Sequence, residues 1–462
     1  MAEVQEIKKE QENGRLGSLF NLMDRFTGDK VILLIALFLM LISVVSVFSS
    51  TPLLARELGT GRMDIMLDQL KAVAMGFIFI FILYFFGRVE IYRRLSMLGF
   101  AVTFGILIIL VLNLNLGLVK AGSINGARRI LLVAGKQIHV YEFVKVFMIM
   151  YLGWALDTFK RHGFTFLPWL AWKFPKLAFL EKDFYQKMFY IYLPIFLTTF
   201  MVMMGSNSSA LFIGLIMVLM ILVGGIDGKD IGIMVLALAV GVGSMFLAWK
   251  AGLLKESRIG TAISRITQDD DAVMRKLLDA PRGSKDYNDA RDELKQPVSA
   301  LLAIKEGGVF GKGIGNSTQK YATPVIFGDY MFSFIIEESG IIGAILIILL
   351  YFSLLARGTL VAKECDKYYD KMIVTGLIIL VTGQAFMHMA VNVHLPFVPQ
   401  TGQTLPLVSH GTNSLLVFSI VFGILLSISK DAKENIARRE AKAEAEPIIV
   451  HDDDQWTQSA SV

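Results

Sequence analysis

Cysteine and charged residues are scarce in this chain, and each shortage excludes a class of protein. Cys365 is the single cysteine among 462 residues, which excludes an intramolecular disulfide and a Cys/His metal site. Charged residues make up only 18%, and apolar runs of roughly seventeen or more residues with almost no charge recur along the chain. A soluble domain of this size would not contain such runs, so the sequence predicts an integral membrane protein.

Targeting and repeat signals are also missing. About thirty mostly polar residues precede the first apolar run, so a cleavable signal peptide is not expected and the first span should stay in the mature protein. The formal net charge is +5, but lysine and arginine cluster in short loops between apolar runs. We interpret this clustering as membrane topology, and no nucleic-acid partner is expected.

The apolar runs predict an all-α polytopic membrane protein with about ten transmembrane helices. The predicted spans are residues 31–48, 72–86, 98–116, 143–156, 188–204, 210–226, 231–249, 334–355, 372–390 and 414–428. The one long polar passage, 250–333, lies between the seventh and eighth spans and is predicted to be a large outer loop.

The distribution of lysine and arginine predicts the orientation. If the head is cytoplasmic, most basic residues of the short loops fall on the inner side, which places both termini in the cytoplasm. Residues 1–30 then form a cytoplasmic head, 31–430 the membrane domain, and 431–462 a cytoplasmic, disordered tail. The inner loop 160–187 interleaves aromatic residues with lysine and is interpreted as an interfacial anchor.

Asp329 stands alone beside the eighth predicted span. The apolar residues that follow it should raise its pKa and let it accept a proton near neutral pH. The alternative is a carboxylate that only stabilises a helix N-terminus. Glu337 and Glu338 come about two turns later inside the span, where an ionisable group is costly unless it is paired or faces a polar interior.

Two further groups of charged residues are candidates for substrate contacts. Glu142 and Lys145 are three residues apart on one helix face and could form an ion pair. Arg128 and Arg129 lie in a predicted outer loop, against the topological trend, which suggests a nearby anion such as a pyrophosphate. Lipid headgroups or a carboxylate of the same protein remain alternatives for these arginines.

Two segments are predicted to be non-helical. Glycines are dense at 307–315 and set a backbone path rather than a helix. Residues 399–414 combine prolines, glycines and hydroxyl groups between apolar spans, which favours a re-entrant loop lining a cavity over a plain surface loop.

These segments resemble the SEDS family (shape, elongation, division and sporulation proteins), and more closely its cell-division type, FtsW, than its elongation type, RodA. The resemblance covers residues 31–430. It rests on Asn125-Gly-Ala-Arg-Arg129 with Glu142 and Lys145, on Gln296 and the glycine-rich segment 307–320, on Asp329 with Glu337-Glu338, and on Gln384, Asn392 and 399–414. The family's usual Ser-Tyr-Gly-Gly-Ser-Ser is replaced here by Ser409-His-Gly-Thr-Asn-Ser414.

The resemblance implies an enzyme that polymerises lipid II into peptidoglycan glycan strands during cell division and releases undecaprenyl pyrophosphate. Asp329 would be the catalytic carboxylate. The substrate-binding residues that the resemblance implies are Arg128, Arg129, Glu142, Lys145, Gln296, Lys312, Glu338, Thr404 and Ser409. A divalent cation, Mg²⁺ or Mn²⁺, could assist, although no metal ligands are assigned.

The resemblance also implies a location and partners. The enzyme would lie in the cytoplasmic membrane and work with a class B penicillin-binding protein, a transpeptidase whose transmembrane helix docks on the bundle, and with other divisome proteins. Two rival functions stay open at this point. One is a lipid-linked precursor flippase or transporter, and the other is a catalytically silent scaffold.

Overall fold

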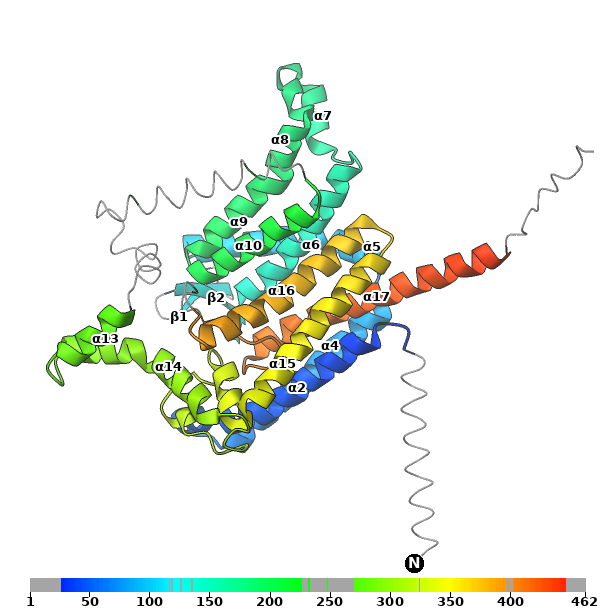
Figure 1. Cartoon of the computed structure of the whole chain (residues 1–462). Helices are drawn as coiled ribbons and strands as arrows, with labels where there is room; N and C mark the ends of the chain where they lie inside the picture. The colour runs from blue at the N-terminus through cyan, green and yellow to red at the C-terminus, as the bar shows by residue number, and fades with distance from the viewer. Residues whose placement is uncertain are drawn as a thin grey trace, which may run out of the picture.

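The computed structural model describes residues 26–226 and 270–445 together with positions 232 and 247, except for 116, 118, 125–126, 134–135, 324, 396–397 and 399–401. Helices packed side by side make up most of this part of the chain (Figure 1). The larger helices are α2 (Lys30–Ser50), α4 (Arg62–Phe86), α5 (Val89–Leu112), α6 (Val140–Lys160), α9 (Leu193–Met203), α10 (Asn207–Val223), α14 (Lys285–Gly307), α15 (Met331–Glu364), α16 (Tyr368–Asn392) and α17 (Thr412–Ala445). Shorter elements are α3 (Pro52–Leu58), α7 (Phe166–Lys173), η1 (Pro175–Glu181), α8 (Asp183–Lys187), η2 (Met188–Tyr192), α13 (Asp270–Asp279) and η3 (Gln319–Tyr321).

The helices match the predicted spans. Within the described residues, seven helical stretches are long and apolar enough to cross a membrane, and α10 is a shorter apolar helix. Each predicted span coincides with a helix except 231–249, which falls almost wholly outside the described residues. The protein is therefore a multi-pass membrane protein, as the sequence predicts.

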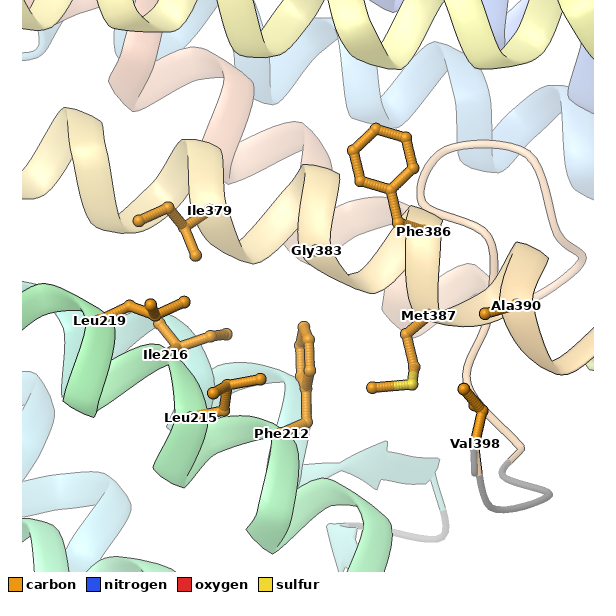
Figure 2. A pocket seen from close by; sticks show the side chains of 10 residues that line it. All are labelled: Phe212, Leu215, Ile216, Leu219, Ile379, Gly383, Phe386, Met387, Ala390 and Val398. Atoms are coloured by element: carbon orange, nitrogen blue, oxygen red, sulfur yellow. The ribbon is translucent and has the colours of Figure 1, made fainter. Parts of the chain in front are cut away.

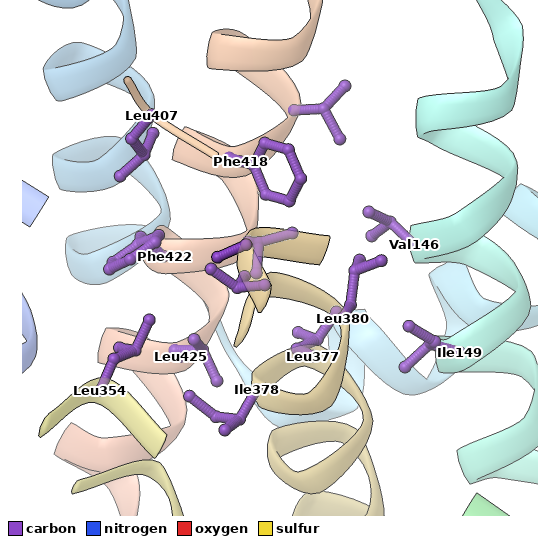
Figure 3. Packing of buried hydrophobic residues seen from close by; sticks show 14 of the residues in the cluster. Val146, Ile149, Leu354, Leu377, Ile378, Leu380, Leu407, Phe418, Phe422 and Leu425 are labelled. Carbon is purple, nitrogen blue, oxygen red and sulfur yellow. The ribbon is translucent and has the colours of Figure 1, made fainter. Parts of the chain in front are cut away.

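The two most buried spans, α16 and α17, form the centre of the bundle. In each, 72% of the most apolar window is buried, against 28% in α5 and in α15. Figure 3 shows side chains of α6, α15, α16 and α17 interlocking around Leu377 and Phe422. Lipid tails are as apolar as these side chains, so close van der Waals packing, rather than escape from water, stabilises this core.

The outer faces of the bundle are apolar as well. Phe85 is 62% exposed, Leu98 63% and Ile342 53%, and they lie on three different helices. So much exposed apolar surface would be unusual in a soluble monomer, but it is what contact with lipid requires.

A small sheet interrupts the helical architecture where the sequence predicts a loop. Strands β1 (Val119–Ile124), β2 (Ala127–Val133) and β3 (Lys136–His139) pair antiparallel in that order. The segments are short and rich in Val, Ile and Leu, and Asn125-Gly126 separates the first two, which is a strong hairpin signal. The sheet is an addition to the predicted fold, not a change of its class.

The two ends of the bundle differ in charge. At one end, called here the basic end, Arg93 and Arg161 both pair with the buried Asp157, and Arg357 pairs with the buried Asp29. The other end, called here the sheet end, carries β1–β3 and the segment 402–411, where Asn413 Nδ2 donates a hydrogen bond of 3.1 Å to a carbonyl of β3.

Candidate active site

Asp329 lies at the sheet end, directly before α15. Its backbone N–H donates to the carbonyl of Val325 in a turn, and α15 begins two residues later at Met331. Its carboxylate faces the segment 402–411, because a Cβ atom on Gly402 would lie 2.8 Å from Asp329 Oδ2. The carboxyl group predicted to act as a base is therefore half-buried beside the non-helical segment that the sequence predicts to line a cavity.

Helix α16 holds the Asp329 carbonyl and the first turn of α15 that follows it. Asn392 Nδ2 donates to the Asp329 carbonyl at 3.0 Å, and Asn392 Oδ1 accepts the Ser333 N–H at 2.9 Å. One turn earlier, His388 Nε2 accepts the Phe332 N–H at 3.3 Å. Its hydrogen-bond partners are main-chain groups distant in the chain, so the sequence around His388 gives no sign of them.

The segment 402–411 forms hydrogen bonds with the residues just before Asp329. Ser409 Oγ donates to the Gly328 carbonyl at 2.7 Å, and the His410 N–H donates to the Phe327 carbonyl at 2.9 Å. Ser409 is only 4% exposed. The structure thus brings Ser409 next to Asp329, but its hydroxyl is engaged with main chain, including the Leu405 N–H that it accepts.

A chain of buried and half-buried polar groups joins three helices to this segment. Lys145 Nζ on α6 donates to Glu142 at 2.8 Å and to Gln384 Oε1 on α16 at 2.6 Å. Gln384 Nε2 in turn donates to the Thr404 carbonyl at 3.0 Å, and Thr404 Oγ1 lies 2.8 Å from Ser414 Oγ on α17. The predicted ion pair of Glu142 and Lys145 is therefore present, and it leads to Thr404.

Lys312 and Glu338, two other predicted substrate residues, lie in clusters that anchor the glycine-rich segment to α15. Lys312 Nζ donates to Glu306, to Thr318 at 2.8 Å and to Glu337 at 2.9 Å. Glu338 accepts Ser49 Oγ at 2.5 Å and the Gly315 N–H at 3.0 Å. An α-helix rises about 1.5 Å per residue, so Glu338 lies on the order of 10 Å along α15 from Met331, the first residue of that helix.

The glycine-rich segment also repairs a break in α15. Gly340 has φ 71° inside the helix, so carbonyl and N–H groups around it lose their helical partners. The Lys312 and Gly313 N–H groups donate to the Glu337 and Glu338 carbonyls at 2.9 Å each. A Cβ on Gly340 would lie 2.2 Å from the Val309 carbonyl oxygen, so only glycine fits this contact.

Several ionisable groups at the sheet end have shifted pKa values. Hydrogen bonds from Lys312 and Thr318 lower the pKa of Glu306. Desolvation opposes the charged form of Lys312, but its bonds to Glu306 and Glu337 outweigh that cost and raise its pKa. Burial lowers the pKa of His410, with the charge of Asp68 opposing the shift. Burial, together with the nearby charge of Asp329, raises the pKa of Tyr330.

The remaining predicted residues are placed less completely. Gln296 lies on α14, half-buried, in the polar passage that the sequence predicts as a loop and that contains α13 and α14. Arg128 and Arg129 lie on β2 rather than in an open loop, and their side chains fall outside the described part of the structure.

Among the described residues, no group of three or more His, Cys, Asp or Glu side chains could hold a metal ion. Dependence on Mg²⁺ or Mn²⁺ remains a prediction.

An apolar cavity of about 270 Å³ lies between α10 and α16 (Figure 2). Phe212 and Ile216 come from α10, Gly383 and Met387 come from α16, and Val398 closes one end. Gly383 precedes Gln384 in the polar chain, and the Lys145 ammonium lies 5.9 Å from the Phe212 ring centroid. The cavity and the buried polar chain are thus neighbours.

Comparison with known proteins identifies the family. The model of the FtsW/RodA/SpoVE family, described as "Cell cycle protein", matches residues 29–434. The chain belongs to the FtsW/RodA/SpoVE family. Because the matched region contains Asp329, the polar chain and the segment 402–411, the geometry described above is that of a FtsW/RodA/SpoVE protein.

Several relatives are named for a peptidoglycan glycosyltransferase activity, and one is named "Stage V sporulation protein E". The "Probable peptidoglycan glycosyltransferase FtsW" of Geobacter metallireducens is 26% identical over 89% of this chain and 97% of its own length. The protein of the same name from Thioalkalivibrio sulfidiphilus is 29% identical over 45% of this chain, and the match spans only about half of that relative, 52%.

Solved structures share the fold. A chain of a peptidoglycan synthase complex, solved to study the coordination of polymerization and crosslinking, aligns with a TM-score of 0.59 at 19% identity, over 88% of this chain and 98% of its own. The rod shape determining protein RodA of Thermus thermophilus aligns with a TM-score of 0.55 at 18% identity, over 88% of this chain and 99% of its own. At these identities the likeness establishes the polytopic fold.

Proposed function

We propose that this FtsW-type protein is a peptidoglycan glycosyltransferase that polymerises lipid II during cell division. The observation that carries the proposal is the Asp329 carboxylate, held at the end of a membrane bundle against the segment 402–411. A base in this position meets substrates whose sugars are in water and whose tails are in lipid. The apolar cavity between α10 and α16 supports a lipid-linked substrate.

The proposed reaction needs one base. Asp329 takes the proton of the sugar 4-hydroxyl on one substrate, and that oxygen attacks the anomeric carbon of the other. The bond from the anomeric carbon to the pyrophosphate oxygen breaks, and undecaprenyl pyrophosphate leaves with the bonding electrons. Because the leaving group is already activated, a second carboxylate of the kind that hydrolases use is not required. Arg128 and Arg129 are proposed to neutralise the pyrophosphate.

The polymerisation assay tests this function. Purified protein supplied with fluorescent lipid II, with and without a class B penicillin-binding protein, should form glycan polymer, and Asp329→Asn should form none. Asp292→Asn is the matched control, because Asp292 is exposed on α14 and pairs only with the adjacent Arg291 among the ion pairs described. Polymer made by Asp329→Asn would refute the base. Movement of labelled lipid across vesicles without polymer from the wild type would instead support a flippase.

The proposed location is the cytoplasmic membrane, with both termini in the cytoplasm and Asp329 on the outer side. The gathering of Arg93, Arg161 and Arg357 at the end opposite Asp329 supports this orientation. In a Cys365→Ser background, an impermeant maleimide should label Asp292→Cys in intact cells and Glu434→Cys only after lysis. The reverse labelling would contradict the orientation.

The proposed partners are a class B penicillin-binding protein, docked through its transmembrane helix, and other divisome proteins. Support comes from the fold shared with a chain of a peptidoglycan synthase complex. Co-purification of the full-length chain with the transpeptidase tests this proposal. A transpeptidase variant with a different transmembrane helix should no longer co-purify, and that result would locate the contact in the membrane.

A further inference from the structure

We propose that His388 and Asn392 are positioning residues for Asp329. The inference rests on the proposed function. Both residues lie on the central helix α16, both are buried, and both form hydrogen bonds with the main chain that carries Asp329. His388 and Asn392 set the position of the Asp329 main chain, and Asp329 itself is the base.

The first step of the argument concerns the start of α15. The first N–H groups of any helix lack partners in the helix itself, and a side chain at the N-cap usually accepts from them. Tyr330 is at the N-cap here and makes no such bond. The acceptors come from α16 instead, through His388 Nε2 for Phe332 and Asn392 Oδ1 for Ser333. The start of α15 is therefore tied to another helix.

Asn392 links the Asp329 carbonyl to the first turn of α15. Its Oδ1 accepts from Ser333 after Asp329, and its Nδ2 donates to the Asp329 carbonyl and, at 2.8 Å, to the His388 carbonyl. Because one end faces an N–H and the other faces carbonyls, only one orientation of the amide satisfies all three bonds. An aspartate in its place would set a carboxylate oxygen against two carbonyls.

His388 joins the aspartate's helix to the segment that the carboxylate faces. Its Nδ1 lies 2.6 Å from the Gln403 carbonyl, so Nδ1 carries the proton and Nε2 is left to accept from Phe332. Gln403 follows Gly402, the residue against which the carboxylate rests. One neutral tautomer thus sets the separation between Asp329 and its facing segment.

The two ring nitrogens can be removed separately. His388→Asn places an amide near the Nδ1 position and keeps the bond to Gln403, whereas His388→Gln places one near the Nε2 position and keeps the bond to Phe332. Misplacing a catalytic group by about 1 Å can cost on the order of 100-fold in rate. We expect each variant to lower kcat by about 10-fold to 100-fold, with KM within about twofold, and His388→Ala to lower kcat further.

The experiment measures kcat and KM for lipid II polymerisation together with the thermal midpoint in detergent. Asn392→Ala and Asn392→Asp should behave as the histidine variants do. Thr382→Val is the control, because Thr382 is buried on the same helix and bonds only within it, to the Ile378 carbonyl. Variants that keep the wild-type midpoint and lose kcat support positioning.

Two results would overturn the inference. The first is a wild-type kcat in folded His388→Ala and Asn392→Ala, and the second is a raised KM with kcat unchanged, which would make these residues substrate contacts. If Asn392→Ala does not fold, the His388→Asn and His388→Gln pair decides the question. Failure of the proposed function itself is seen separately, as absence of wild-type polymer or as activity in Asp329→Asn.

Discussion

Lys145 on α6 donates a hydrogen bond of 2.6 Å to Gln384 on α16, two residues that are 239 positions apart. The lysine is 1% exposed, and its carboxylate partner, Glu142, lies on its own helix. A buried ammonium needs such partners, because an unpaired charge in the bilayer is costly. The ion pair therefore stabilises the junction of α6, α16 and Thr404.

Removing Lys145 alone should be harmful, because Glu142 would remain as a largely buried charge without a cation. We expect Lys145→Met to lower the free energy of unfolding by about 3–5 kcal/mol. The double variant Lys145→Met with Glu142→Gln should recover most of that loss. Thermal unfolding of the purified protein in detergent measures both, and equal losses in the single and double variants would contradict a coupled pair.

Gly340→Ala should prevent normal packing of α15. The new Cβ would meet the Val309 carbonyl oxygen at 2.2 Å, and φ 71° disfavours any side chain. We expect a loss of about 2–3 kcal/mol or more in unfolding free energy, seen as poor yield or a lowered thermal midpoint. Gly105→Ala on α5 is the control, since its Cβ would meet nothing within 4 Å, and it should be neutral or slightly stabilising. Similar midpoints for the two variants would refute the need for glycine at 340.

His410 should make stability depend on pH. Burial lowers its pKa in the folded state below the ordinary 6.5, so between these two values the unfolded chain binds more protons. Stability is therefore complete above about pH 6.5 and falls as the pH decreases through the folded pKa. Thermal midpoints at pH 7.5 and 5.5 should differ less in His410→Gln than in the wild type. An equal pH response in the two proteins would assign the dependence to other groups.

Asp29 combines two roles at the basic end. Its Oδ1 accepts the N–H groups of Val31 and Ile32 at 3.0 Å each, and its Oδ2 accepts from Arg357 Nε at 3.1 Å. Asp29→Asn keeps the cap and loses the charge, whereas Asp29→Ala loses both. We expect thermal midpoints to fall in the order wild type, Asn, Ala, with about 0.5–2 kcal/mol attributable to the cap. If Asp29→Ala is as stable as Asp29→Asn, the helix cap does not contribute to stability.

The fold was largely predictable because length and lack of charge identify a membrane helix without knowledge of its neighbours. The sheet of β1–β3 was missed although Asn125-Gly126 was available as a hairpin signal. The break at Gly340 could not be foreseen, because the residues that repair it lie about thirty positions earlier and become partners only in the folded bundle.

The candidate site was predictable in part for the same reason. The pairing of Glu142 and Lys145 follows from their spacing on one helix, and the structure confirms it. The partners of Glu338 do not follow from spacing, since they lie on α2 and in the glycine-rich segment. Lys312 likewise pairs with Glu306 on α14 and Glu337 on α15. The contacts of His388 could not be predicted, because hydrogen bonds to distant main-chain groups leave no trace in sequence. The roles assigned to Asp329, Gln296, Arg128 and Arg129 remain predictions.

The interruption at Gly340 separates the Asp329 end of α15 from the rest of that helix. A continuous α-helix behaves as a rod that passes a push along its axis, and the nine residues from Met331 to Ser339 are cut off from the rod behind them. Thickening or thinning of the surrounding bilayer acts on the longer, lipid-facing piece. The piece Met331–Ser339 and Asp329 before it are held instead by α16 and by the glycine-rich segment, so we expect the position of the Asp329 carboxylate to change little under stress in the membrane.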